Sequence, residues 1–382
     1  MQQMIYLDYA ATTPCDVRVL DAMRPYWATV FANPSSTHRL GRQAAYALES
    51  ARSQVLHLCA GGQGHIMFTS GATESNNLAT YSMVRYVRDV VRRPTILCLP
   101  TEHKSVLDPL IWWSGQLGVR VEWLRVTPTG EIDREDFVDR LGDQIGGVVV
   151  QAANSETGVV QDLAFVTQKA HECGATVFAD VTQAIGRIPL HFGELELDWA
   201  SMSSHKVYGP KGIGALYARA GSLVHPLSFG GGQESGKRPG TQNVAGAAGF
   251  ATAVELALHE LPQASNRLAL LRDRMWAKVC PVNDVFWNGS GAPLLPSHLN
   301  VTIDGVPAQE LMLRAQTVAI SAGSACNATS TQPSPVLLHM GRTKMDAECT
   351  VRVTVGRPTT ELEIDLAGSE LVRCIDAIRT AR

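Results

Sequence analysis

The chain carries, at residues 201–212, the stretch Ser-Met-Ser-Ser-His-Lys-Val-Tyr-Gly-Pro-Lys-Gly. Lys206 stands next to a histidine and two serines, and a turn rich in glycine and proline follows. Upstream, Asp180 directly follows the apolar run Ala175-Thr-Val-Phe-Ala179. An acid in that position lies at the end of a predicted strand, so this part of the sequence indicates a sheet with a polar site at its edge.

The same pattern extends on both sides of this stretch. From residue 64 to about 230, short apolar runs alternate with polar or glycine breaks and helical stretches; the runs are 66–68, 95–99, 119–121, 148–150, 176–179 and 214–217. Such alternation predicts an α/β fold with a mostly parallel sheet covered by helices on both faces. Ligands bind these sheets beyond the carboxyl ends of the strands, so the residues that follow the runs are the candidates for a site.

The remaining chain predicts further helices and a smaller unit. We expect helices at about 17–27, 41–58 and 244–279, the last with a break at Pro262. The last third predicts strands at 298–303, 318–320 and 350–355, a helix at 308–313, and a terminal helix capped by Thr360 and Glu363. We therefore predict a large domain at 16–260 and a smaller α/β domain made of 1–15 and 261–382.

Composition excludes several classes of protein. The formal net charge is −3, with 45% hydrophobic and 18% charged residues, which is typical of a globular protein and indicates no direct nucleic-acid partner. We see neither a signal peptide nor an apolar stretch of the roughly 18 residues that a membrane helix needs. The eight cysteines have no metal-ligand spacing, which indicates a reducing, cytoplasmic location with most of these thiols buried.

The residues at the strand ends suit pyridoxal 5'-phosphate. A lysine can link covalently to the aldehyde of that cofactor, and an acid such as Asp180 can pair with its ring nitrogen. After the run 66–68, Thr69-Ser-Gly71-Ala72-Thr73 opens a helix whose free N–H groups attract an anion, although a capped helix explains this turn equally well. His103 and Asn154 follow the runs 95–99 and 148–150. Groups suited to one cofactor at five strand ends are much rarer by chance than any single one.

Each of these residues also has a structural explanation when it is taken alone. A lone histidine such as His103 is more often structural, Asp180 can cap a helix, and Asn33 can form a turn. Two other features favour a function. Cys326 lies in a loop of small polar residues at about 321–335, which is typical of a reactive thiol. Arg352, on an otherwise apolar strand, needs a carboxylate partner such as that of a bound amino acid.

With these motifs, the sequence resembles the cysteine desulfurases of the NifS/IscS kind, group I, among the fold-type-I pyridoxal phosphate enzymes of the class-V aminotransferase family. The resemblance covers nearly the whole chain in the same order. The motifs that carry it include Tyr6-Leu-Asp-Tyr-Ala-Ala-Thr-Thr13, Asn33-Pro-Ser-Ser36, Thr69-Ser-Gly-Ala-Thr-Glu-Ser-Asn-Asn77, Thr101-Glu-His103, Asn154-Ser-Glu-Thr-Gly158, Asp180-Val-Thr-Gln183, Ser203-Ser-His-Lys206, Gly230-Gly-Gly-Gln-Glu234, Arg238-Pro-Gly-Thr241, Gly323-Ser-Ala-Cys326 and Arg352-Val-Thr-Val-Gly-Arg357.

The resemblance implies a seven-stranded sheet in the large domain, a homodimer, and roles for particular residues. Lys206, His103 and Cys326 are implied as catalytic, and Asn33 and Arg352 as ligands of the substrate carboxylate. The implied cofactor-binding residues are Gly71, Ala72, Thr73, His103, Asn154, Asp180, Gln183, Ser203, His205, Lys206 and, reaching in from the partner subunit, Thr241.

The activity that the resemblance implies is removal of sulfur from L-cysteine, with release of alanine and formation of a persulfide on Cys326. The sulfur then passes to an acceptor protein. A selenocysteine lyase or an aminotransferase would share Lys206 and Asp180, and a catalytically vestigial sulfur-transfer scaffold is the alternative of another class. The sequence leaves the acceptor open among iron–sulfur cluster assembly, tRNA thiolation and DNA sulfur modification.

Overall fold

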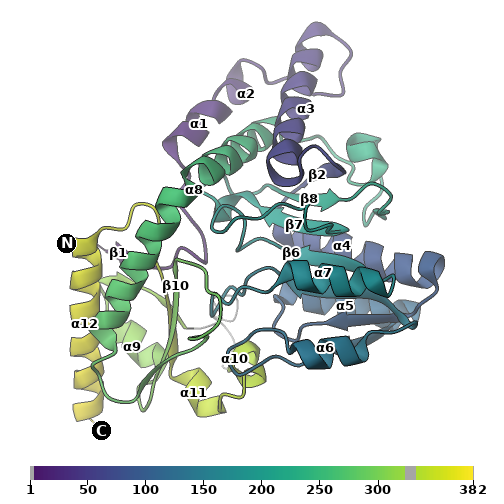
Figure 1. Cartoon of the computed structure of the whole chain (residues 1–382). Coiled ribbons are helices and arrows are strands. Elements are labelled where there is room, and N and C mark those ends of the chain that lie inside the picture. The colour runs from purple at the N-terminus through teal and green to yellow at the C-terminus, as the bar shows by residue number, and fades with distance from the viewer. Residues whose placement is uncertain (1–3, 323–332, 382) are drawn as a thin grey trace.

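A seven-stranded sheet runs through the centre of the computed structural model, which describes residues 4–322 and 333–381 (Figure 1). Its strands, in spatial order, are β2 (His65–Thr69), β8 (Gly214–Ala218), β7 (Trp199–Ser203), β6 (Thr176–Asp180), β5 (Ile145–Gln151), β3 (Thr95–Cys98) and β4 (Arg120–Trp123). From β7 to β4 all neighbours are parallel, whereas β8 is antiparallel to both of its neighbours. The predicted mostly parallel α/β sheet is confirmed.

Strand β7 was absent from the predicted runs. Its sequence, Trp-Ala-Ser-Met-Ser, has no β-branched residue and two serines, so it lacks the apolar signal of its neighbours. All five of its residues are nevertheless buried, because the strand lies inside the sheet between β6 and β8. The position of β7 between two other strands, and not its β-propensity, therefore explains why these residues form a strand.

Helices cover both faces of the sheet, and alternate strand residues point to opposite faces. Ile96, Val149 and Phe178 pack toward α4 (Ala72–Tyr86) and α5 (Lys104–Leu117). The neighbouring residues, such as Leu97 and Val148, pack toward the opposite face. That face is covered by α1 (Val17–Met23), α3 (Arg39–Ala60), α6 (Arg134–Arg140), α7 (Leu163–Glu172) and the first half of α8 (Val244–Val279). The predicted helix at 17–27 is divided into α1 and α2 (Pro25–Ala28).

Helix α8 is continuous through Pro262, so the predicted break is wrong. Proline has no N–H to donate and normally costs about 3 kcal/mol inside a helix. Here both halves of the helix are held by separate cores, the first by residues such as Phe250 and Val254 and the second by Leu271 and Met275. By length and hydropathy alone α8 could span a membrane, which is also true of core helices in globular proteins.

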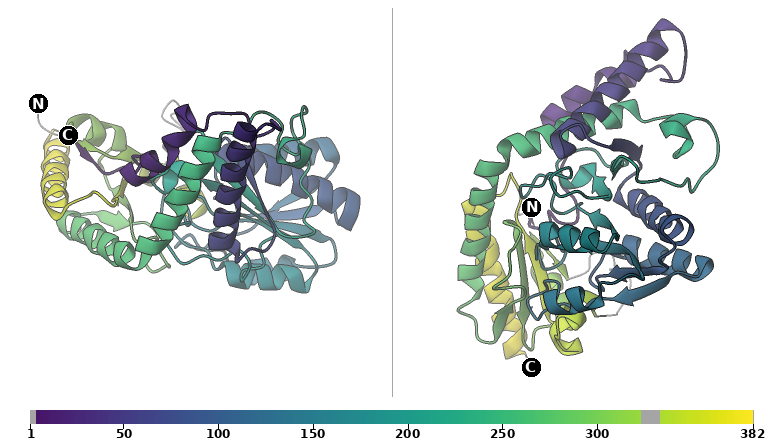
Figure 2. Two further views of the ribbon diagram at one scale, coloured as in Figure 1. Left: turned by 90° about the horizontal axis from the view of Figure 1, so that it is seen from above. Right: turned by 45° about the vertical axis from the view of Figure 1, so that its right-hand side comes forward.

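The second core belongs to a smaller unit, where α12 (Glu361–Thr380) lies alongside the second half of α8 (Figure 2). Its antiparallel sheet has the order β12 (Ser321–Ala322), β13 (Thr350–Thr354), β10 (His298–Ile303) and β9 (Val285–Trp287). A parallel pair is formed by β1 (Ile5–Tyr6) and β11 (Val318–Ala319). The remaining helices are α9 (Ala308–Arg314), α10 (Pro335–His339) and α11 (Lys344–Glu348).

Two features of this unit bear on the sequence predictions. The capping box is confirmed, because the Thr360 hydroxyl accepts from Glu363 N at 3.2 Å and Thr360 N donates to the Glu363 carboxylate at 2.7 Å. Ile5 and Leu7 pack in the same core as Leu268 and Leu271. Because the core residues are divided in this way, we propose that the two domains meet at residues 260 and 261, within α8.

Candidate active site

A cavity of about 790 Å³ lies where the carboxyl ends of the central strands meet the smaller unit. Its walls come from both units and from the N-terminal segment 10–12. The predicted site residues that line it are Gly71, Ala72, Thr73, His103, Asp180, Gln183, Ser203, His205, Lys206 and Arg352. The chain thus brings together ten residues that are widely spaced in sequence.

Lys206 ends a single 3₁₀ turn, Ser204–Lys206, that directly follows β7. Its Nζ donates to the backbone oxygens of Ala10 at 2.5 Å and Ala11 at 2.8 Å, so the N-terminal segment holds the amine in the cavity. Arg187 supports the same region from behind, since its Nη2 donates to the backbone oxygens of Tyr9 at 3.1 Å and Lys206 at 3.3 Å. Burial lowers the pKa of Arg187 to about 10.

The N-terminus of α4 lines the same cavity as this lysine, and helix N-termini attract anions. Gly71 is its N-cap and makes no side-chain capping bond, which leaves the first amides of the helix open to the cavity. A Cβ atom added to Gly71 would lie 3.8 Å from Ser203 Oγ, and one added to Gly214 would lie 2.7 Å from the Gly71 Cα. The contact at Gly214 is too close for a Cβ atom, so glycine there lets the start of α4 approach the end of β8, whereas the contact at Gly71 is an ordinary one. Thr73, on the first turn, is exposed.

His205 closes the same end of the cavity as a neutral ring. Its Nδ1 lies 3.1 Å from Thr12 Oγ1. Burial, followed by the charges of Lys206, Lys211 and Arg187, lowers the pKa of His205 to about 4. At neutral pH the positive charge that faces an anion here therefore comes from the lysines and the helix amides, and not from the imidazole.

The Asp180 carboxylate lies at the end of β6 and is 8% exposed. Its Oδ1 accepts from Thr182 N and its Oδ2 from Asn76 Nδ2, each at 2.9 Å. Glu102 also lines the cavity, and burial, followed by the nearby charge of Asp180, raises its pKa well above the usual range. The raised pKa therefore favours the neutral form of Glu102.

Gln183 and Asn154 are both buried and are held mainly by backbone groups. Gln183 Nε2 donates to Ala10 O at 3.1 Å, and its Oε1 accepts from Arg187. Asn154 is not among the residues that line the cavity, because its Nδ2 donates to Thr101 O at 3.2 Å and its Oδ1 accepts from two backbone amides. In this structure Asn154 thus shapes the loop after β5, and its predicted contact with a ring oxygen stays a prediction.

Arg352 reaches the cavity from β13 and is almost fully buried. Its Nη2 donates to Asp8 Oδ1 at 2.6 Å and to Ser321 Oγ at 3.3 Å, and its Nη1 donates to Ser155 O at 2.8 Å. Within the described residues, its Nε is buried without a hydrogen-bond partner. The sequence predicted a carboxylate partner for this arginine, and the chain itself supplies one in Asp8.

Glu156 lies in the same part of the cavity and accepts a hydrogen bond from Ser334 Oγ at 2.5 Å. Burial raises the pKa of Glu156, while the hydrogen bond from Ser334 and then the charge of Arg352 act against that shift. Ser321 and Ser334 flank the segment 323–332, so a cavity residue binds each side of that segment. Cys326 itself lies outside the described residues.

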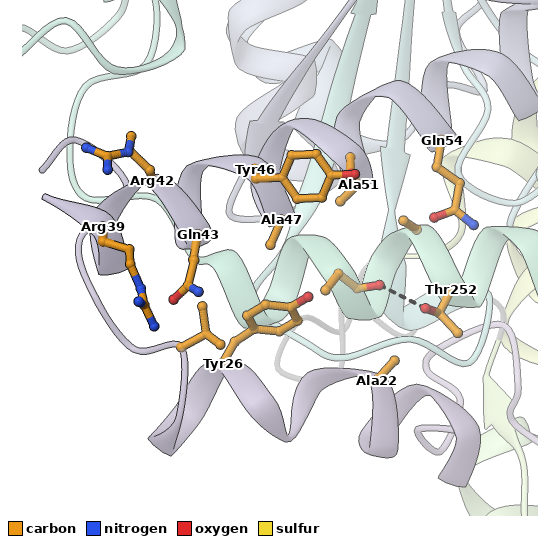
Figure 3. A pocket seen from close by; sticks show the side chains of 14 residues that line it. Ala22, Tyr26, Arg39, Arg42, Gln43, Tyr46, Ala47, Ala51, Gln54 and Thr252 are labelled. Carbon is orange, nitrogen blue, oxygen red and sulfur yellow. Dashed lines mark hydrogen bonds between the residues drawn. The ribbon is translucent and has the colours of Figure 1, made fainter. Parts of the chain in front are cut away.

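Asn33 and Thr241 are exposed, and neither lines the cavity of its own chain. Asn33 Oδ1 accepts from Ser35 N at 2.9 Å, which is the turn-forming contact that the sequence left open. Asn33 lies in the connection between α2 and α3. A second hollow, of about 600 Å³, is lined by residues of α1, α2, α3 and α8 (Figure 3). Tyr26, Tyr46, Arg39 and Arg42 line that hollow.

Sequence reasoning missed several residues that hold this site together. Asp8, Asn76, Glu102 and Glu156 lie inside quoted motifs, but their polar partners come from distant segments that a sequence does not reveal. Among the described cysteines, Cys59, Cys98, Cys349 and Cys374 are buried as expected, whereas Cys280 is exposed.

Comparison with known proteins places this cavity in a family context. The chain matches the aminotransferase class-V family over residues 5–366, a range that includes every residue lining the cavity. It is 39% identical over 379 residues to the cysteine desulfurase IscS of Rickettsia akari (strain Hartford), covering 98% of this chain and 92% of that protein. A solved NifS-like protein is similar with a TM-score of 0.90 and 31% identity, covering 98% of this chain and 100% of that one. SspA in complex with cysteine is similar with a TM-score of 0.79 and 31% identity, covering 92% and 98%.

Proposed function

The chain belongs to the class-V aminotransferase family and is a pyridoxal-phosphate-dependent cysteine desulfurase, and from this premise we propose how its own residues carry the reaction. The observation that supports the proposal most is the convergence of Lys206, Asp180 and the open amides of α4 on one cavity. An amine, a carboxylate and an anion site are the groups that an aldehyde, a ring nitrogen and a phosphate require.

The residues of the cavity fit the cofactor at both ends of its ring. Gly71, Ala72, Thr73, Ser203 and His205 would hold the phosphate, and Asp180 would pair with the ring nitrogen. When bound, pyridoxal phosphate takes up the substrate amine and withdraws electrons from its Cα. Lys206 would link to the cofactor at rest and then remove the Cα proton through Nζ.

The substrate carboxylate is assigned to Arg352. Its buried Nε has no partner within the described residues, so it is the polar atom that a ligand would satisfy. Asp8 keeps Nη2 and fixes the plane of the guanidinium. In this arrangement Asp8 orients the arginine, and the amino acid that enters the cavity takes the remaining N–H.

The sulfur step needs a thiol, and no cysteine is among the described residues that line the cavity. We assign this role to Cys326, whose thiolate attacks the sulfur of cysteine. An S–S bond forms while the C–S bond of the substrate breaks, and the electron pair of that bond stays on Cβ, which is then protonated. Overall, one enzyme thiol and one cysteine become one enzyme persulfide and one alanine, so no external oxidant or reductant is required.

The homodimer is part of the same proposal. Asn33 and Thr241 are exposed and lie outside the cavity of their own chain, and large apolar side chains such as Trp27 (64%), Tyr46 (77%) and Phe229 (88%) are exposed. A second copy would cover these side chains and bring Thr241, and by the same argument Asn33, to the opposite cavity. The acceptor of the sulfur is not assigned, and the cytoplasmic location stays a prediction.

One substitution tests the proposal, because only this reaction requires the loop thiol. Cys326→Ser should retain the absorbance of the bound cofactor and the mass of a dimer, since the thiol does not bind the cofactor. Alanine release should fall by about 100-fold or more, as for loss of a nucleophile. Mass spectrometry of the wild type after cysteine treatment should find one additional, reducible sulfur on the Cys326 peptide.

Cys280 provides the matched control, because it is an exposed thiol outside the cavity. Its peptide should stay unmodified, and Cys280→Ser should keep full activity. The proposal is wrong if the persulfide forms mainly on another cysteine while Cys326→Ser releases alanine at the wild-type rate.

A further inference from the structure

Three consecutive hydrogen bonds join two walls of the cavity. Asn76 Nδ2 donates to Asp180 Oδ2 at 2.9 Å and to Ser105 Oγ at 2.8 Å, and Ser105 Oγ lies 2.7 Å from His103 Nδ1. Asp180 and His103 line the cavity, while Asn76 is fully buried on α4 where that helix packs against α5. A polar side chain buried between two helices costs free energy unless it is hydrogen-bonded, and Asp180 and Ser105 provide those bonds for Asn76.

The charge of Asp180 sets the direction of these bonds. A carboxylate only accepts, so the amide of Asn76 must turn its NH₂ group toward Asp180. The opposite orientation would place the amide oxygen against the carboxylate. With this orientation Asn76 has one N–H for Asp180 and one for Ser105, and within the described residues its Oδ1 has no partner.

The orientation of Asn76 also determines which hydrogen bond Ser105 makes to the imidazole of His103. Because its Oγ accepts from Asn76, its own hydroxyl proton is available for His103 Nδ1. Its backbone N also donates to Nδ1, at 3.1 Å, as part of the cap of α5. A ring nitrogen that accepts two hydrogen bonds carries no proton, so the proton of the neutral imidazole is on Nε2.

We propose that Asn76 and Ser105 are positioning residues that hold the neutral His103 ring in its Nε2-protonated form, so that this ring donates to the cavity and does not take up a proton there through Nε2. The inference rests on the role proposed above for Asp180 and on the catalytic role that the family resemblance implies for His103. It adds to them a physical link, since the charge that pairs with the cofactor nitrogen also selects the tautomer of the ring on the neighbouring wall.

Capping of α5 alone does not explain the arrangement. The backbone N–H of Ser105 already bonds to His103 Nδ1, so the cap requires neither the hydroxyl nor Asn76. The serine hydroxyl adds a second donor to the same nitrogen, and the asparagine orients that donor. The hydrogen bonds of Asn76 and Ser105 therefore connect the N-terminal cap of α5 to the Asp180 carboxylate on β6.

The tautomer can be read directly from the ring nitrogens. We would label the histidines of the holoenzyme with ¹⁵N and assign the His103 signals by their loss in His103→Gln. In the wild type Nδ1 should show the shift of an unprotonated nitrogen and Nε2 that of a protonated one. In Ser105→Ala the fraction of the Nδ1-protonated form should rise by about 2- to 10-fold, the equivalent of one hydrogen bond. Ser105→Thr keeps a hydroxyl and should restore the wild-type signals.

Ser114 offers the matched control for loss of a serine hydroxyl. It lies on the same helix, is buried, and its Oγ has no partner among the residues that the structure describes. Ser114→Ala should leave the His103 signals unchanged. Ser105→Ala spectra identical to the wild type would overturn the proposal.

A second variant tests the link to Asp180. Asn76 is buried, and its side chain donates to Asp180 and Ser105 rather than to His103. Asn76→Ala should nevertheless move the His103 signals in the same direction as Ser105→Ala. The double variant should add little to either single change. If Asn76 only supports Asp180, its loss will change the absorbance of the bound cofactor without moving the His103 signals, and the link is then wrong. The spectra are recorded without cysteine, so they remain informative even if the proposed sulfur chemistry fails.

Discussion

The two ends of the cavity are built in different ways. We call the group of Lys206, His205 and the first amides of α4 the lysine end, and the group of Arg352, Asp8, Glu156 and Ser334 the arginine end. At the lysine end, backbone groups hold the functional amine, since the carbonyls of Ala10 and Ala11 accept from Lys206 Nζ. At the arginine end, most of the contacts join two side chains, as Asp8 holds Arg352 across 344 positions of sequence.

This difference separates two kinds of function. Backbone contacts at strand and helix ends do not depend on the identity of the surrounding side chains, which suits a tightly held cofactor. Pairs of side chains depend on both partners and on how the two units pack. The arginine end, to which we assign the substrate carboxylate, also binds Ser321 and Ser334, which flank residues 323–332.

The largest effect should come from breaking the lysine end. Lys206→Ala removes the only group there that we assign to both the covalent link and proton removal, so turnover should fall by about 100- to 10,000-fold. The absorbance of the covalently bound cofactor should also disappear. Lys169→Ala, a surface lysine on α7 paired with Glu172, is the control and should keep both properties. A Lys206 variant that turns over cysteine normally would disprove the assignment.

An intermediate effect should come from the arginine end. Arg352→Ala removes a charge-assisted partner of the substrate carboxylate, so the KM for cysteine should rise by about 10- to 100-fold. The cofactor absorbance should stay, because the lysine end is intact. Arg352→Lys should restore the affinity only in part, since an ammonium lacks the planar fork of arginine.

Steady-state kinetics and absorbance of the same preparations separate the two effects. Arg373→Ala, an exposed arginine paired with Glu370 on α12, is the control for loss of a guanidinium. An unchanged KM in both Arg352 variants would place the carboxylate site elsewhere in the cavity.

The smallest effect should come from Glu156→Gln. Burial raises the pKa of Glu156 in the folded chain, so the folded state holds this proton more tightly than the unfolded chain does. From the ordinary pKa of 4.5 up to the raised value, stability therefore falls as pH rises. Glutamine cannot lose a proton, and it still accepts from Ser334, so the variant should lack this loss.

Thermal unfolding across that pH range measures the difference. The Tm advantage of Glu156→Gln over the wild type should increase with pH until Glu156 is ionised in the folded chain. Glu194→Gln, on an exposed glutamate, should run parallel to the wild type. If the Glu156→Gln curve is also parallel to the wild type, Glu156 is not held in its neutral form.

The sequence alone could predict whatever local pattern determines. Short apolar runs and the glycine turn at Gly71 depend on neighbouring residues, and so does the capping box of Thr360 and Glu363. These features predicted the parallel sheet, the ends of its strands and the residues placed there. They failed where the surroundings outweigh propensity, as in β7 and at Pro262.

Tertiary structure alone decided which polar atoms meet. Asn76, Ser105 and Asp8 look like ordinary polar residues in the sequence, because a hydrogen bond between distant segments leaves no local signature. Folding brings α4 against α5 and β1 beside the strands of the smaller unit, and only then do Asp180, Asn76, Ser105 and His103 form one line of hydrogen bonds. The physical reason is that burial removes water as an alternative partner, so each buried polar group must use what the fold places next to it.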